Sequence, residues 1–196
     1  MIIFKQKKNL VVKKINFMEY KLSVLCSVYI GTNSHFFRET LESIRIQTRP
    51  ADEIILLKDG PTTKETDIII NQYLKILPIK VFQLEKTKGL GEVYKVGLKK
   101  CSHEIIALCD SDDINRKDRF KKQLTVFSKE KIDVVSAHIS EFYFHIGDLN
   151  RIRKASITNL DIKKNILWRN PLNHAVSMFK KSSVIKAGGY LNHLFM

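Results

Sequence analysis

The chain has 196 residues, of which 44% are hydrophobic, 28% charged and 9% aromatic, with only 8 Gly and 4 Pro. This composition excludes a collagen, a coiled coil and a wholly disordered chain, and it fits one globular domain that needs no disulfides. The net charge of +14 indicates either a lysine-rich solvated surface or an anionic partner, such as a nucleotide, a lipid headgroup or a nucleic acid.

The chain begins with a basic segment. Residues 1–17 carry five lysines and no acid, so we expect a poorly ordered basic N-terminal extension before a folded domain at 18–196. The extension lacks the cleavage site of a secretory signal and is interpreted as a membrane-surface arm or as extra sequence before Met18. No apolar run reaches the roughly 20 residues of a membrane-spanning helix.

Three cysteines, Cys26, Cys101 and Cys109, match no zinc spacing and are odd in number. Two of them lie in apolar runs. We therefore predict reduced, buried thiols in a cytoplasmic protein.

Up to residue 109, apolar runs alternate with helical periodicity. Strands are predicted at 22–30, 53–57, 79–84 and 104–109. Helices are predicted after Asn33 or Ser34 up to Arg49-Pro50, at 66–77, and from 89 to about 100. This alternation predicts an α/β domain in which helices cover a mostly parallel sheet.

The rest of the chain is less regular. We predict a helix at 118–129, strands at 134–139 and 142–144, and a polar, basic loop at 146–160. A short helix at 162–168, a strand at 175–179 and a helical turn at 182–187 follow, and Gly188-Gly189 breaks that turn.

Acids follow two of the predicted strands. Asp59 comes after the second strand, and Asp110, Asp112 and Asp113 come directly after the fourth. Ligands of open α/β sheets bind beyond the carboxyl ends of the strands. Clustered carboxylates repel one another unless a cation lies among them, and Mg²⁺ or Mn²⁺ shares such oxygens with substrate phosphates. A surface turn with helix-capping acids is the alternative.

Gly89 and Gly91 stand between a strand and a helix, where backbone could approach a diphosphate at the helix N-terminus. Gly97 is misplaced for a G-x-G-x-x-G fingerprint, and the chain has no P-loop. A purely structural turn therefore stays open.

Together, the segments 23–29, 41–48, 52–61, 89–91 and 110–114 resemble a family 2 glycosyltransferase. The resemblance runs from about Lys21 to the last residue. It implies an inverting, nucleotide-sugar-dependent enzyme of the GT-A fold. Asn173-His174 and Gly188-Gly189-Tyr190 are similar to the branch that builds bacterial capsule, exopolysaccharide and O-antigen chains.

The resemblance also assigns roles to residues. It implies that the donor, expected to be a UDP-sugar, is bound by Ser27, Tyr29, Asp59 at the uracil, Gly89, Gly91 and Asp110 at the ribose. It implies Mg²⁺ or Mn²⁺ at Asp112, assisted by Asp113, and places His174 near the diphosphate or the acceptor. The expected acceptor is a saccharide or a lipid-linked sugar, at the cytoplasmic face of an anionic membrane.

Four positions depart from the family pattern. Lys58 replaces an acid, and Ile30, Thr87 and Lys95 each replace an Asn, which weakens the contacts expected there. The acidic pair that supplies the family's general base is expected beyond Met196. We therefore expect a truncated chain that binds the donor and turns over poorly; a non-catalytic nucleotide-sugar-binding protein is the alternative.

Two other functions would fit parts of the sequence. A nucleic-acid-binding protein would explain the charge, but no helix-turn-helix, RNP or zinc pattern is present, so we expect no nucleic-acid partner. A sugar-1-phosphate nucleotidyltransferase would need a Gly-rich signature loop after the first strand, and residues 34–37 do not provide one.

Overall fold

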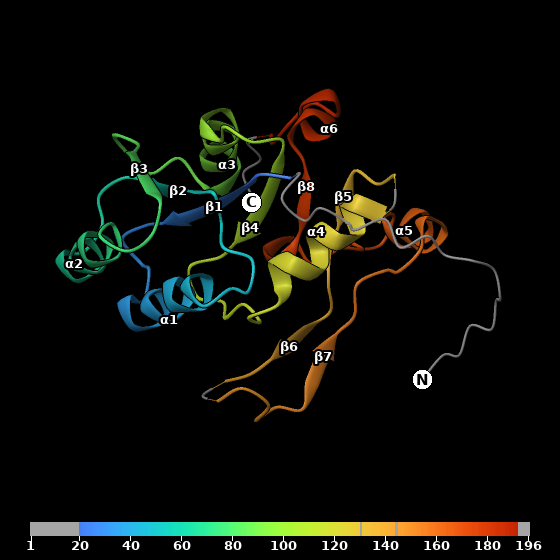
Figure 1. Ribbon diagram of the computed structural model, residues 1–196, viewed down its shortest axis with the longest axis horizontal. Coiled ribbons are helices and arrows are strands. Elements are labelled where there is room, and N and C mark those ends of the chain that lie inside the picture. The colour runs from blue at the N-terminus through green and yellow to red at the C-terminus, as the bar shows by residue number, and fades with distance from the viewer. Residues whose placement is uncertain (1–19, 130, 144, 192–196) are drawn as a thin grey trace.

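The computed structural model describes residues 20–129, 131–143 and 145–191, so the predicted extension at 1–17 lies outside the described residues. Four parallel strands form the centre of a six-stranded sheet, in the order β3 (Ile79–Gln83), β2 (Glu53–Lys58), β1 (Leu22–Val28) and β4 (Ile105–Cys109). β8 (Met178–Lys180) pairs antiparallel with β4, and β5 (Val134–Val135) pairs antiparallel with β8. The predicted mostly parallel α/β sheet is confirmed (Figure 1).

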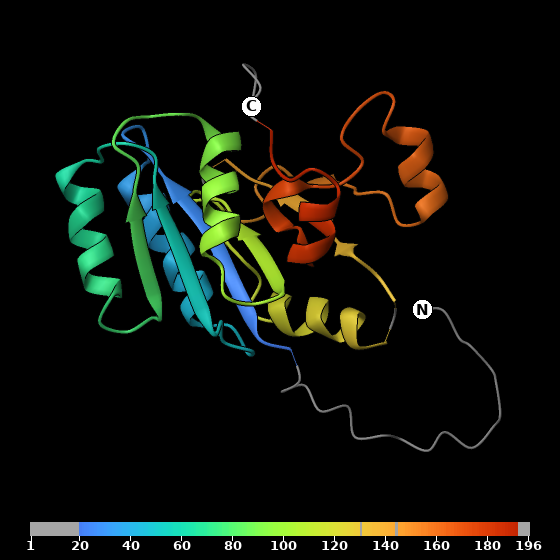
Figure 2. The same ribbon diagram turned by 90° about the horizontal axis from the view of Figure 1, so that it is seen from above.

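Helices cover both faces of the sheet, which explains the continuous apolar strands. One core joins β1 to α1 (Ser34–Arg45), α2 (Lys64–Tyr73) and α4 (Arg119–Lys129). The other joins β1, β2 and β4 to α3 (Leu90–Lys100), with Val184 of α6 (Lys181–Lys186) packed against it. Figure 2 shows α3 and α6 on the same side of the strands.

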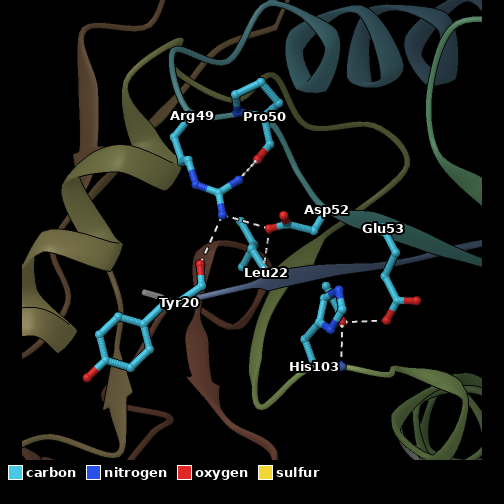
Figure 3. A network of polar contacts seen from close by, with 8 residues as sticks. Tyr20, Leu22, Arg49, Pro50, Asp52, Glu53 and His103 are labelled. Atoms are coloured by element: carbon cyan, nitrogen blue, oxygen red, sulfur yellow. Dashed lines mark hydrogen bonds and ion pairs between the residues drawn. The ribbon is translucent and has the colours of Figure 1, made fainter. Parts of the chain in front are cut away.

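The predicted start of α1 is confirmed, because the Asn33 side chain accepts from the N–H groups of His35 and Phe36. The helix ends at Arg45, before the predicted stop. Arg49 instead donates to the carbonyl of Tyr20 at 2.9 Å and to Asp52 at 2.7 Å (Figure 3). It thereby fastens the connection after α1 to the chain entering β1.

Glu53 organises the edge of the sheet at which β1 and β2 begin. It is buried and accepts hydrogen bonds from Ser23 at 2.6 Å, from Lys80 at 3.0 Å and from the hydroxyl of Ser102 at 2.9 Å. Ser23 in turn accepts from the N–H of His103 (Figure 3). This side chain therefore ties β1, β2, β3 and the chain before β4 together.

The second half departs most from the sequence prediction. Of the predicted strand 134–139 only β5 and residue 139 are strand, and of the predicted strand 142–144 residues 142 and 143 are not. β6 (Ile139–Glu141) instead pairs with β7 (Arg151–Arg153), a short strand inside the predicted loop 146–160. α5 (Asn159–Asn165) begins three residues earlier than expected, because Thr158 and Asp161 form a capping box. The predicted strand 175–179 is split into the 3₁₀ turn η1 (His174–Val176) and β8.

The predicted burial of the three cysteines is confirmed, and none of them forms a disulfide. Within the described ranges, none of the helices combines the length and the apolar character needed to cross a bilayer.

Candidate functional site

The carboxyl ends of β1, β2 and β4 bring the predicted site residues to one edge of the sheet. Lys58 pairs with Val28, so Asp59 follows β2 next to Tyr29. Cys109 pairs with Cys26, so Asp110 follows β4 at the level of Ser27. The two strand-end acids thus flank β1 on either side.

Asp59 fixes the loop that leads into α3. Its carboxylate accepts from the backbone N–H groups of Lys88 at 2.8 Å and Gly89 at 3.1 Å. Gly60 has φ +80°, and a Cβ there would lie 2.9 Å from the backbone nitrogen of Thr87. The turn after β2 and the start of α3 therefore form one clamped unit, and the uracil role of Asp59 stays a prediction.

Three of the four departures from the family pattern have local structural partners. Thr87 donates its hydroxyl to the carbonyl of Asp59 at 3.1 Å. Lys58 pairs with Asp67 at 2.7 Å, and Lys95 pairs with Glu92 at 3.4 Å. Thr87 and Lys58 thus make contacts within the fold, whereas Lys95 makes a surface ion pair along α3.

Tyr94 connects α3 to the acid at the end of β4. It is fully buried, and its hydroxyl donates to Asp110 at 2.9 Å. Burial, followed by the charge of Asp110, raises the pKa of Tyr94 well above its ordinary value. At neutral pH the phenol therefore keeps its proton and holds one oxygen of Asp110 in place.

His174 packs against this pair. Its ring lies 5.2 Å from that of Tyr94, and its Nε2 lies 3.2 Å from the hydroxyl of Tyr190. Burial lowers the pKa of His174, and the nearby charge of Asp110 opposes that effect. The structure thus brings together His174 and Asp110, which the sequence singled out separately, through Tyr94 and Tyr190, whose contacts it did not predict.

Asp112 and Asp113 differ in their surroundings. Asp112 is exposed on the turn after β4, whereas Asp113 is half-buried. Burial and the charges of Asp110 and Asp112 raise the pKa of Asp113 to about 6. Neither acid caps α4, which begins only at Arg119, so the helix-capping alternative is wrong.

The donor chemistry of these acids fits a hard divalent cation, since like charges have accumulated at a strand end and carboxylate oxygens are its preferred ligands. In the described part of the chain, no group of three or more Cys, His, Asp or Glu is placed to hold a metal. Mg²⁺ in enzymes is commonly held by one or two carboxylates together with substrate phosphates. Asp112 with Asp110 or Asp113 meets that requirement.

The side chain of Arg119 stabilises the carboxyl end of β4. This buried guanidinium donates to the carbonyl of Leu108 at 2.7 Å, to Cys109 at 3.3 Å and to Asn115. Sequence reasoning missed it. The available signal was an arginine on the apolar face of α4, beside Phe120 and at helical spacing from Gln123.

A cleft of about 760 Å³ opens beside Asp110 and His174. The hairpin and the chain before η1 line its far side with basic groups: Arg151, Arg153, Lys154 and Arg169. Glu141 pairs with Arg151 at 2.9 Å and with Arg153 at 2.6 Å. The remaining positive charge suits an anionic ligand.

The sequence prediction assigned most of this wall to a loop. Arg151, Ile152 and Arg153 alternate as a strand does, and that was the available signal. Asn173 holds the wall in place, because its amide donates to the carbonyls of Ala137 at 2.7 Å and Arg153 at 3.2 Å.

Comparison with known proteins identifies a family and a fold. The profile of the family "Glycosyl transferase family 2" matches residues 23–187. The chain is 39% identical over 175 residues to the UDP-Gal:alpha-D-GlcNAc-diphosphoundecaprenol beta-1,3-galactosyltransferase of Escherichia coli, covering 88% of this chain and 62% of that protein. It is 36% identical to the amylovoran biosynthesis glycosyltransferase AmsE of Erwinia amylovora, covering 89% of this chain and 65% of that protein.

Solved structures share the fold. Residues 1–349 of Staphylococcus aureus TarS superpose with a TM-score of 0.66 at 24% identity, covering 87% of this chain and 50% of that chain. The Pyrobaculum calidifontis mannosyltransferase PcManGT, solved with GDP-Man and Mn²⁺, gives a TM-score of 0.64 at 14% identity, covering 88% and 48%. The chain therefore spans half to two thirds of the length of these relatives.

Proposed function

The chain belongs to glycosyl transferase family 2, and we propose that it transfers a sugar from a UDP-sugar, with inversion, to a saccharide or lipid-linked acceptor during surface polysaccharide synthesis. The observation that carries this proposal is the position of Asp110. It directly follows a buried strand, is held by Tyr94 and faces a basic cleft. The Escherichia coli relative named for UDP-Gal supports the choice of donor.

In this proposal the donor lies across the carboxyl edge of the sheet. Ser27 and Tyr29 line the nucleotide pocket, and the clamp of Asp59 on Lys88 and Gly89 sets the backbone that approaches the diphosphate. Asp110 accepts a ribose hydroxyl with its orientation fixed by Tyr94.

A divalent cation, Mg²⁺ or Mn²⁺, would be held by Asp112 with Asp113 and would offset charge on the diphosphate. Arg169 and Lys154 add positive charge across the cleft. His174, kept neutral by burial, lies beside Asp110 and borders the space in which the acceptor would meet the donor. The acceptor of the Escherichia coli relative carries a diphosphate, which fits the same cleft.

A second candidate function is nucleotide-sugar binding without sugar transfer. It is favoured because the acids that line the cleft already have hydrogen-bond or ion-pair partners. The acidic lining residues of the cleft within the described ranges are Asp110 and Glu141. Tyr94 already donates to the first, and two arginines pair with the second. Neither is a free carboxylate of the kind that an inverting transfer uses to deprotonate an acceptor.

Calorimetric titration with UDP and Mn²⁺ tests the shared premise. We expect the unaltered chain to bind, Asp112→Asn to bind at least about tenfold more weakly, and Asp118→Asn, a nearby acid paired with Lys122, to bind normally. Equal binding by all three would contradict the proposed site.

Sugar transfer separates the two functions. Labelled UDP-galactose is incubated with Mn²⁺ and an acceptor that carries α-linked GlcNAc on a diphosphate. Transfer by the unaltered chain and not by Asp112→Asn supports the enzyme, whereas UDP binding without transfer supports the second candidate.

A further inference from the structure

The segment 157–169, which contains α5, projects from one end of the molecule. Figures 1 and 2 place α5 at the end remote from α2, beyond the sheet. The N–H of Ser156 donates to the carbonyl of Pro171 at 2.8 Å and closes the base of the segment. Asn165 donates its amide to the hydroxyl of Ser156 at 3.1 Å. We call the segment 157–169 the arm; these hydrogen bonds hold its base in place.

The arm holds its helix without help from the core. Thr158 and Asp161 bond reciprocally, with the N–H of Asp161 donating to the Thr158 hydroxyl oxygen at 3.1 Å. No residue of α5 is buried. A helix of 7 residues has little stability of its own, so a capped helix with no fully buried residue favours a surface used for an external contact.

The apolar side chains of the arm point to the same conclusion. Five large ones are mostly exposed: Ile157 82%, Leu160 69%, Ile166 62%, Leu167 81% and Trp168 87%. Single exposed apolar residues are ordinary, but a run of this size marks an interaction site. Trp is also the residue that proteins favour at the boundary between lipid and water.

The charges beside these residues are almost all positive. Lys163, Lys164 and Arg169 belong to the arm, and Arg151, Arg153 and Lys154 precede it. The single acid from 151 to 169 is Asp161, which the capping box already uses. Basic groups interleaved with Leu, Ile and Trp are typical of segments that lie in the interface of an anionic membrane.

We propose that the arm 157–169 docks the protein on an anionic lipid bilayer, with Trp168 and its apolar neighbours among the headgroups and the lysines on lipid phosphates. Arg169 belongs both to the arm and to the cleft beside Asp110, so docking sets the mouth of the cleft at the bilayer surface. Docking on the bilayer is a property separate from sugar transfer, and it requires no bound nucleotide sugar.

The sole tryptophan of the chain, Trp168, is a reporter placed inside the arm. The full chain is titrated with vesicles of phosphatidylcholine containing phosphatidylglycerol, without UDP. We expect the emission of Trp168 to move to shorter wavelength with anionic vesicles, to stay unchanged with pure phosphatidylcholine, and to revert at high salt.

A double charge reversal tests whether membrane binding depends on the lysines of the arm or on the basic surface as a whole. Lys163→Glu with Lys164→Glu should weaken the partition into anionic vesicles about 30-fold or more, because each lysine near the surface contributes roughly a fivefold factor. Lys64→Glu with Lys75→Glu is the matched control on and just after α2, with the same change in net charge. The control should bind normally.

Three results would overturn the inference. They are vesicle binding without a shift of Trp168, equal losses in the two double variants, and a Trp168 shift without lipid that grows with protein concentration. The last result would assign the arm to self-association. A folded Trp168→Ser chain that sediments with vesicles as well as the unaltered chain would also contradict it. UDP binding in solution is independent of all of these results.

Discussion

Tyr94 links the core of the molecule to its candidate site, because its ring packs in one core while its hydroxyl reaches Asp110. Sequence analysis identified Asp110 from its place after an apolar strand. It could not identify Tyr94, because the contact joins a helix and a strand end that only the folded sheet brings together. The same holds for Arg119, whose partners lie on β4 and the turn that follows.

Tyr94→Phe removes the hydrogen bond and keeps the ring. A hydrogen bond to a charged group contributes about 1.5–3 kcal/mol, so we expect a lower affinity for UDP and Mn²⁺, by roughly tenfold, with the fold retained. Calorimetry measures the affinity.

Tyr73→Phe is the matched control for this variant, since its hydroxyl makes only long contacts of 3.4 and 3.5 Å in the other core. Its UDP affinity should equal that of the unaltered chain. If the two variants bind UDP equally well, Tyr94 does not position Asp110 for the donor.

At the scale of elements, the first half of the chain was predictable because its signals are local. The strands of the parallel centre are mostly apolar, with unbroken apolar stretches in β2 and β4, and Asn33 marks the start of α1. The hairpin of β6 and β7 was missed because its strands are short and exposed. It pairs residues ten or more positions apart in the sequence, with ion pairs from Glu141 to Arg151 and Arg153 across it.

The turn after β2 yields a prediction about backbone geometry. Gly60→Ala places a side chain at φ +80° and drives its Cβ against the backbone of Thr87, so we expect a loss of about 2–4 kcal/mol in the free energy of unfolding. Gly147→Ala has φ +94° with open space around the new Cβ, and should lose only about 1 kcal/mol. Urea denaturation compares the two, and equal losses would show that the clamp between Asp59 and α3 is not tight.

Glu53 yields a prediction about pH at the opposite edge of the sheet. Burial alone would raise its pKa, but hydrogen bonds from Ser23, Ser102 and Lys80 outweigh burial and lower it to about 2. Relative to an ordinary 4.5, this corresponds to about 3 kcal/mol of stability. The contribution is complete above pH 4.5 and is lost as the pH falls toward 2.

Glu53→Gln should therefore destabilise the chain at pH 7 and flatten the fall in stability below pH 4.5. Glu42→Gln, an exposed residue paired with Arg45, should change stability by less than about 0.5 kcal/mol. Urea denaturation at pH 7, pH 4 and pH 2.5 measures both variants. An unchanged pH slope in Glu53→Gln would contradict the role of Glu53 in joining the strands.

At the scale of the whole molecule, the two edges of the sheet have separate tasks. The edge where β1 and β2 begin is closed by Glu53 and Arg49 and serves stability (Figure 3). The other edge gathers Asp59, Asp110 and the basic cleft, and the arm 157–169 extends beyond it at one end. The sequence could predict which edge gathers the strand-end acids, because parallel strands end together there. The shape of the cleft depends on long-range pairing and could not be predicted.

The most direct test of the central claim, that the donor and its metal lie at the carboxyl edge, is paramagnetic broadening in nuclear magnetic resonance spectra. Spectra of the chain with UDP are compared in the presence of Mn²⁺ and of Mg²⁺. Broadening by Mn²⁺ falls off steeply with distance, and the five residues of β4 separate the two edges by roughly 17 Å. We predict that amides at 110–113, 59–60 and 89–91 broaden more strongly than those at 53 and 102–104. Broadening centred on Glu53 and Ser102, or none at all, would contradict the account.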